Sequence, residues 1–369
     1  MKKLLGIISG ALQGFLVLLI LLMLVDATLD AILYAGSLDF SDPAESYQRV
    51  LAKANPEYEP GGPRDRSMQD FYSVERVPTV ADGTQHAPLR SETVNITPDG
   101  IRLNGHLPVA DPVLDVALLG GSQTFGPFIN DDETLSARLE DEWPGLSVAN
   151  FAVPRMVIDE SVASWLSSPL ADRTDLVLHL AGPLELLFLC SNFVPEDAEV
   201  LDPHELRLLY GARRIIHYLT KPKPPQRCDG SPKEIDSMVN RVMADFAGGQ
   251  AMAEARGVPY VAVLPPMMFT GSANAVNLGI GPKGLSIMRK RRPDAIAYQH
   301  LIERMAAQQR IPVIDLTHAL DGVDHAYLDM GQHYTAKGTL VLAKALAMEL
   351  RKLLASGKIA SLASRVSAQ

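Results

Sequence analysis

The chain has 369 residues, of which 47% are hydrophobic, and its formal net charge at pH 7 is -9. It exceeds the roughly 100–200 residues of a usual domain, so we expect one domain with appended segments. A net negative protein is repelled by phosphate backbones, which argues against nucleic acid as a partner. His318 and His325 lie near His333, but these spacings fit no recurrent metal pattern, and we expect no metal site.

Residues 4–25 form an uncharged apolar run of 22 residues in which Gln13 is the only strongly polar side chain. As a helix the run would span about 33 Å, enough for the roughly 30 Å hydrocarbon layer. Two lysines precede it and two aspartates follow it, so the positive-inside rule exports everything after Val25. We therefore expect a membrane anchor over 1–35, in a single-pass protein of a bacterial inner membrane with its main domain in the periplasm or outside the cell. A cleaved signal peptide is the alternative, although the run is longer than the roughly 7–15 residues of a signal core.

Residues 36–110 are polar and rich in Pro, Gly and Asp, and we expect a linker with short strands over 91–96 and 100–103. From residue 111 onward, short apolar runs alternate with amphipathic stretches. Strands are predicted over 114–119, 146–149, 175–181, 260–264 and 311–315, and helices over 133–142, 156–167, 234–256, 294–309 and 335–354. This alternation predicts βαβ units, and therefore a three-layer α/β/α fold with a parallel sheet over 111–369. His179 falls in one of these strands and is expected to be a hydrogen-bonded core residue.

An excursion at about 186–232 interrupts the alternation, with a helix predicted over 203–219. Cys190 and Cys228 lie near its two ends. An oxidising compartment permits a disulfide between them, and two buried thiols are the alternative. Ligand sites in such sheets lie at the carboxyl ends of the strands, so an insertion there is expected to form a lid or a substrate wall.

Candidate catalytic residues stand at two strand–helix junctions. The first strand runs into GGSQTFG (120–126), whose glycines permit a tight turn that exposes the hydroxyl of Ser122. Taken alone, this segment is also compatible with an ordinary glycine-rich loop or an anion-binding loop. Near the other end of the chain, Asp329 and His333 precede the closing helix. They match the orienting acid and the base that a serine nucleophile needs.

Together these segments resemble the SGNH/GDSL hydrolase family, in its membrane-anchored bacterial type. The stretch 120–126 is similar to the family's nucleophile block, and NFAVP (150–154) stands where the block Asn-x-Gly-Val-Pro-Gly is expected. HYTAKG (333–338) looks like the end of the final block. Residues 95–102, and residues 131–134 after the serine, also resemble segments of the family's membrane-anchored bacterial members. The resemblance implies the flavodoxin-like SGNH fold.

The resemblance also implies a two-step acyl transfer. Ser122 would attack an ester carbonyl, with His333 as general base and Asp329 orienting the imidazole. The implied oxyanion and substrate-binding set comprises Gly121, Gln123, Asn150, Arg155 and Gly182. Such a site needs neither a metal nor an organic cofactor. The expected function is that of an extracytoplasmic serine esterase, O-acyl hydrolase or acyltransferase acting on a small ester or an acylated cell-envelope polysaccharide.

Two departures from the family pattern concern the oxyanion site. Arg155 stands where the block Asn-x-Gly-Val-Pro-Gly has its last glycine. A long cation at this position would either clash with a substrate or recognise an anionic one. The block Gly-x-Asn-Asp is replaced by the sequence GPLE at 182–185, which contains no Asn. A third oxyanion donor is therefore missing, and Pro183 has no N–H to replace it. Asn192 is the nearest substitute in sequence.

A third departure concerns the acid, because Asp329 precedes His333 by four residues rather than three. A helical turn would still bring the two together, and Asp324 and Asp315 are alternative carboxylates. These differences leave a second function open, a catalytically degenerate SGNH domain that serves as a binding or assembly component. A third possibility is a lipid-facing esterase that the anchor holds near its substrate.

Overall fold

A computed structural model of the chain describes residues 63–78, 84–190, 230–268, 270, 293–328 and 333–359, together with Leu21 and Leu362. The rest of the predicted anchor over 4–25, the helix predicted over 203–219, and Asp329 lie outside the described residues. Within the described ranges, no helix combines the length and the apolar character needed to cross a bilayer. All described residues except Leu21 fall in one compact unit, which is formed by 48–193 and 226–369.

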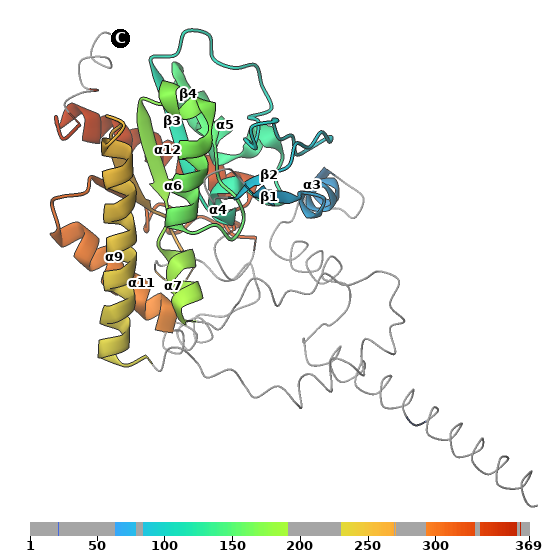
Figure 1. Ribbon diagram of the computed structural model, residues 1–369. Helices are drawn as coiled ribbons and strands as arrows, with labels where there is room; N and C mark the ends of the chain where they lie inside the picture. The colour runs from blue at the N-terminus through green and yellow to red at the C-terminus, as the bar shows by residue number, and fades with distance from the viewer. Residues whose placement is uncertain are drawn as a thin grey trace, which may run out of the picture. The chain divides into compact units, whose positions relative to one another are not determined.

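The core of this unit is a parallel sheet of five strands (Figure 1). The strands are β3 (Leu114–Gly120), β4 (Leu146–Asn150), β5 (Leu176–Leu180), β6 (Tyr260–Leu264) and β7 (Val313–Asp315), in the order β4-β3-β5-β6-β7. Every residue of β5 and β6 is buried, which explains why these strands read as continuous apolar runs. The order is the flavodoxin-like one, so the predicted parallel sheet of the α/β/α fold and all five predicted strands are confirmed, with ends shifted by at most two residues.

Helices cover the sheet in two groups (Figure 1). One group consists of α5 (Leu135–Glu142) and α12 (Ala336–Ala355), which pack against each other; the other consists of α6 (Ile158–Ser167), α7 (Pro183–Cys190), α9 (Pro232–Glu254) and α11 (Pro293–Ala307). The helix predicted from residue 133 begins later because Asp131–Glu133 form a 3-10 turn, and Thr134 then caps α5 by accepting a hydrogen bond from the Ala137 N–H. Neither α7 nor the short α4 (Ser122–Phe125) was expected from the sequence.

The segment expected to be a linker is instead folded against the domain where the structure describes it. It contains α3 (Pro63–Tyr72) and an antiparallel hairpin of β1 (Arg76–Pro78) and β2 (Thr84–His86). The strands predicted over 91–96 and 100–103 are reduced to isolated bridges at Ile96 and Arg102. The physical reason is a small second core, in which apolar residues of this segment pack on residues of the sheet's loops: Val94 and Ile96 against Phe125 and Ala152, with Phe71 beside them.

Cys190, at the end of α7, is disulfide-bonded. Cys228, the chain's only other cysteine, lies outside the described residues. Of the two alternatives for the cysteines, the structure therefore has the disulfide rather than free thiols.

Candidate active site

The turn that carries Ser122 depends on two glycines at the end of β3. Gly120 has a φ of +154°, and a Cβ there would collide with the Thr124 side chain and the Leu180 carbonyl. Gly121 has ordinary dihedral angles, but a Cβ on it would lie 2.8 Å from Leu184 Cδ2. Ser122 then occupies the first position of α4, where backbone N–H groups have no intrahelical acceptor. The sequence GGS thus places a partly exposed hydroxyl beside free backbone donors at the carboxyl edge of the sheet.

A buried arginine holds the other end of α4. The Arg102 guanidinium donates hydrogen bonds to the carbonyls of Phe125, Gly126 and Ile129, at 2.8, 2.5 and 2.7 Å. Its Nε donates to Asp131 at 2.9 Å. Burial raises the pKa of Asp131, while the neighbouring Arg102 acts in the opposite direction. Arg102 therefore satisfies carbonyls that a four-residue helix leaves open, and it fixes the loop that follows the nucleophile turn.

Asn150 has a structural position rather than the predicted role in oxyanion or substrate binding. Its side chain is 1% exposed, and its Nδ2 donates to the Thr124 carbonyl at 3.3 Å and to Ser136 Oγ at 3.2 Å. Its Oδ1 accepts the Ala152 N–H at 3.1 Å. Every one of these contacts lies inside the domain, so Asn150 ties the loop after β4 to α4 instead of facing a ligand.

The segment before α12 fixes His333 through its neighbours in the HYTAKG motif. The Tyr334 hydroxyl donates to the Pro266 carbonyl at 2.8 Å, and Thr335 caps α12 by accepting the Gly338 N–H at 3.0 Å. Gly338 is required by close approach, because a Cβ there would collide with the Ala326 carbonyl. The backbone that follows His333 is therefore anchored in the core.

The structure brings Ser122 and His333 together. His333 Nε2 lies 2.8 Å from Ser122 Oγ, across 211 residues of sequence, and both residues are partly exposed. This is the hydrogen-bond distance that a general base requires to take the proton of a serine nucleophile. The pair lies where the loops after β3 and β5 diverge, since Gly120 and Leu180 are paired neighbours at the ends of these strands. Open α/β sheets bind ligands at such a switch point.

The orienting carboxylate remains a prediction, because Asp329 lies outside the described residues. Of the two alternatives, Asp315 is bonded elsewhere: its Oδ1 accepts the Thr317 N–H at 2.9 Å and the Thr317 hydroxyl at 2.6 Å. Asp324, the other alternative, is among the described residues and also stays a prediction.

The loop after β5 departs from an oxyanion loop in two ways. The Gly182 N–H donates to Glu185 Oε2 at 2.6 Å, so this predicted site residue does not offer its N–H to a substrate. Leu184 stands two residues after Gly182, at the position of the family's Asn, and it packs beside the nucleophile turn. Full burial raises the pKa of Glu185 to about 7. The third oxyanion donor is therefore replaced by an apolar side chain.

Of two further predicted residues, Gln123 lies within the turn as the second residue of α4. Arg155 directly precedes Met156, whose carbonyl oxygen would lie 3.4 Å from a Cβ on Gly121. Arg155 has a φ of +67°, which explains why a glycine suits this position in the family: few non-glycine residues adopt that conformation. It is also near Arg76 of β1, whose pKa is lowered by burial and by the charge of Arg155. Gln123 is 4% exposed, and its Nε2 has no hydrogen-bond partner among the described residues.

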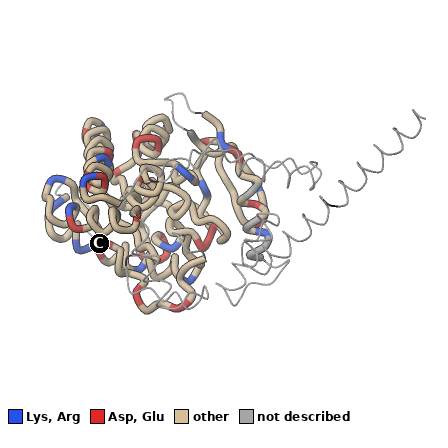
Figure 2. The backbone as a smooth tube through the Cα atoms, turned by 90° about the horizontal axis from the view of Figure 1, so that it is seen from below, with Lys and Arg blue, Asp and Glu red and all other residues tan. Residues whose placement is uncertain are grey.

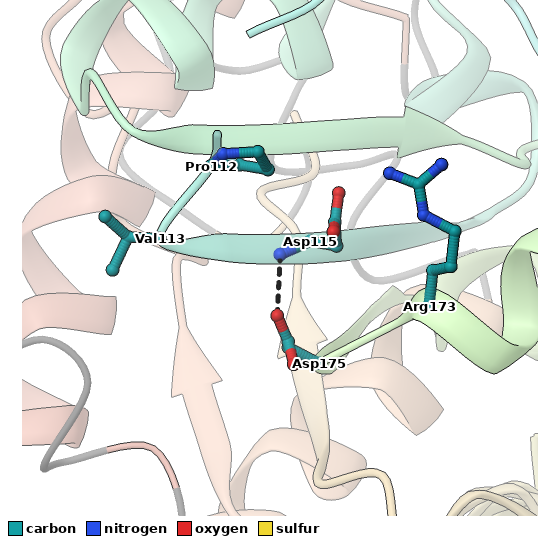
Figure 3. Close-up of a pocket in the computed structure, with 5 residues that line it drawn as sticks. All are labelled: Pro112, Val113, Asp115, Arg173 and Asp175. Carbon is teal, nitrogen blue, oxygen red and sulfur yellow. Dashed lines mark hydrogen bonds between the residues drawn. The ribbon is translucent and has the colours of Figure 1, made fainter. Parts of the chain in front are cut away.

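Other polar features of the domain lie away from Ser122. A hollow of about 590 Å³ lies at the starts of β3 and β5, and therefore at the opposite edge of the sheet. It is lined by Pro112, Val113, Asp115, Arg173 and Asp175 (Figure 3). Basic and acidic residues are interspersed along the described chain in Figure 2. No group of three potential metal ligands occurs among the described residues.

His179 is a buried core residue as predicted, with its Nδ1 2.8 Å from the Tyr260 hydroxyl, and burial lowers its pKa to about 3.

No protein-family model matches the chain, and no curated protein sequence matches it. Solved structures do match. A lipolytic G-D-S-L family protein from Veillonella parvula is 12% identical, with a TM-score of 0.38, over 63% of this chain and 96% of that protein. An acetylxylan esterase from Geobacillus stearothermophilus, solved as a catalytic mutant, is 13% identical, with a TM-score of 0.37, over 65% and 95%. A lipase/acylhydrolase from Enterococcus faecalis is 14% identical, with a TM-score of 0.35, over 65% and 96%.

Proposed function

We propose that the chain is a serine esterase, an O-acyl hydrolase or acyltransferase of the SGNH/GDSL type. The observation that carries this proposal is the 2.8 Å contact between His333 Nε2 and Ser122 Oγ at the carboxyl edge of the sheet. Two segments that are far apart in the sequence bring these two atoms together: the glycine turn after β3 and the segment before α12.

The geometry supports a two-step transfer. As Ser122 Oγ bonds to the acyl carbon, its proton passes to His333 Nε2. When the ester C–O bond breaks, the imidazole returns that proton to the departing alcohol, which leaves an acyl-serine. Water or an acceptor hydroxyl then attacks the acyl carbon while His333 takes its proton, and His333 returns that proton to Ser122 Oγ as the acyl–Oγ bond breaks. Backbone N–H groups at the start of α4 would stabilise the oxyanion.

A binding or assembly domain without catalysis is the second candidate, and specific observations favour it. Leu184 occupies the position of the missing Asn, and the Gly182 N–H is bonded to Glu185 rather than open to a substrate. Removing one oxyanion donor typically costs about 10²–10³ in rate. The loss of one donor slows a serine esterase without abolishing its chemistry, so we favour the enzyme.

For location, we propose a single-pass inner-membrane protein that is anchored through residues 4–25 and has its main domain exported. The charge pattern around the apolar run supports this orientation. The disulfide at Cys190 supports it too, because such bonds persist in oxidising compartments. In that compartment, an acylated envelope polysaccharide or a small ester is the proposed substrate. An anchored enzyme next to a membrane would also reach lipid esters.

Ester hydrolysis by the full chain in detergent tests the proposal. Ser122→Ala should lower kcat for p-nitrophenyl acetate by at least about 10³-fold, because the nucleophile is lost. Ser161→Ala is the matched control, since Ser161 is a buried serine of α6 without a hydrogen-bond partner among the described residues. The same pair of variants, assayed for acetate release from acetylated envelope polysaccharide, tests the substrate. Equal activity in wild type and Ser122→Ala would leave the binding domain as the function.

A further inference from the structure

Phe128, in the loop after α4, has an unusual backbone. Its φ is +64°, and its side chain is 3% exposed. A bulky residue in the left-handed region is a genuine outlier, and such strain persists only where the surroundings determine the conformation. It also tends to occur at functional sites, so the surroundings of Phe128 are informative.

Contacts on both sides of Phe128 impose this conformation. Arg102 bonds the carbonyls of Gly126 and Ile129, which lie on either side of it. From α3, Ser67 Oγ donates to Asn130 Oδ1 at 2.6 Å. The loop is thus held by Arg102 on either side of Phe128, and by Ser67 of α3 at Asn130.

That ring lies between α3 and the histidine. Phe71 of α3 packs edge-on against Phe128, with ring centroids 5.0 Å apart and planes at 70°. Phe128 in turn packs against the His333 imidazole, with centroids 6.2 Å apart and planes at 88°. A row of three rings therefore leads from α3 to the residue that contacts Ser122.

We propose that Phe128 is a positioning residue for His333, and that Phe71 of α3 holds it in place. A side chain that acts as general base works best when packing locks its rotamer. The ring of Phe128 limits rotation of the imidazole away from Ser122 Oγ and restricts water on that side. The contact itself is independent of the proposed function, but its effect on catalysis rests on that function. Residues 63–103 are then part of the active unit and not a spacer.

The test compares two phenylalanines that make the same kind of contact. Phe128→Leu removes the ring beside His333 and keeps an apolar side chain with the same backbone strain. Phe246→Leu removes the ring of α9 that packs on His179 in the buried core, with centroids 6.3 Å apart and planes at 75°. Phe128→Tyr keeps the ring and should rescue activity. Each variant of the full chain is assayed for kcat and KM, and for the rate at which diethyl pyrocarbonate modifies His333, read by peptide mass spectrometry.

We expect Phe128→Leu to lower kcat about 10- to 100-fold with little change in KM, because a small misplacement of a catalytic group has effects of this size. We also expect His333 to be modified several-fold faster, while Phe246→Leu changes neither quantity. Unchanged modification of His333 in Phe128→Leu would overturn the proposal. A wild type that hydrolyses no ester would refute the proposed function, and the modification rate would still decide whether Phe128 positions His333. If Phe128→Leu does not fold, Phe71→Leu should show the same changes at smaller size.

Discussion

Leu184 lies directly against the turn that presents Ser122, since a Cβ on Gly121 would come within 2.8 Å of Leu184 Cδ2. The two residues belong to loops that follow adjacent strands, β3 and β5. The side of the nucleophile where the family pattern has an amide donor is therefore apolar in this chain.

This relationship gives a gain-of-function prediction. Leu184→Asn should raise kcat for a small ester about 10- to 100-fold, because one oxyanion donor is worth about 10²–10³ in rate and the new one is not optimally placed. Leu184→Ala is the control, because it opens the same space without a donor and should not raise kcat. Steady-state kinetics of both variants decide the matter. Equal losses in the two variants would show that the position of Leu184 does not face the oxyanion.

Gly338 and Gly248 form a matched pair of helical glycines. Gly338→Ala should destabilise the fold by roughly 1–3 kcal/mol, because its Cβ overlaps the Ala326 carbonyl and displaces the segment of His333. Activity should fall with it. Gly248→Ala, in α9, meets nothing within 4 Å and should stabilise by about 0.5–1 kcal/mol through helix propensity. Urea unfolding measures both. A neutral Gly338→Ala would contradict the close approach.

Two truncations of Arg155 separate the effect of its charge from the effect of its backbone conformation. Both Arg155→Gly and Arg155→Ala remove the guanidinium, but only glycine adopts a φ of +67° without strain. The glycine variant should therefore be more stable than the alanine variant by about 1 kcal/mol. If the guanidinium recognises anionic substrates, both variants should lose kcat/KM for negatively charged esters and not for neutral ones. Equal losses on both kinds of ester would exclude that recognition.

The raised pKa of Glu185 predicts that the stability of the fold depends on pH. Its folded pKa of about 7 lies above the ordinary 4.5, so the folded state favours the neutral carboxyl. Its contribution to stability is complete below pH 4.5 and is lost as pH rises toward 7, on the order of 3 kcal/mol in all. His86 and His179 act in the opposite sense, since burial lowers the pKa of each. The prediction therefore concerns a difference between variants.

Glu185→Gln should remove this fall, so that its free energy of unfolding relative to wild type increases between pH 5 and pH 8. Glu254→Gln, at an exposed position of α9, is the control and should leave the profile parallel to wild type. Urea unfolding across this range measures both differences. A Glu185→Gln profile parallel to wild type would show that the carboxyl titrates normally.

Much of the sheet could be predicted because each strand carries its signal locally. The buried strands are continuous apolar runs, and the glycine turn and the HYTAKG motif mark their own junctions. Long-range packing explains what was missed. The helix α3 depends on Phe71 meeting Phe125 and Phe128, which are more than fifty residues away, and its own sequence has little periodicity.

The candidate site divides in the same way, between residues with a local sequence signal and residues whose role depends on long-range packing. The sequence singled out Ser122 and His333, but it placed Asn150 in the oxyanion site, where the structure has it holding Thr124. An amide in a motif does not reveal which partner it finds. Nothing in the local sequence marked Phe128. Side chains that act through other side chains are visible only once the fold is known.

The most direct test of the central claim is labelling of the full chain with a fluorophosphonate probe, which reacts with activated serines. We predict that the wild type is labelled at Ser122, that Ser122→Ala abolishes labelling, and that His333→Ala weakens it. Absence of labelling in a folded wild type, shown by cooperative unfolding, would contradict an activated serine and with it the proposed esterase.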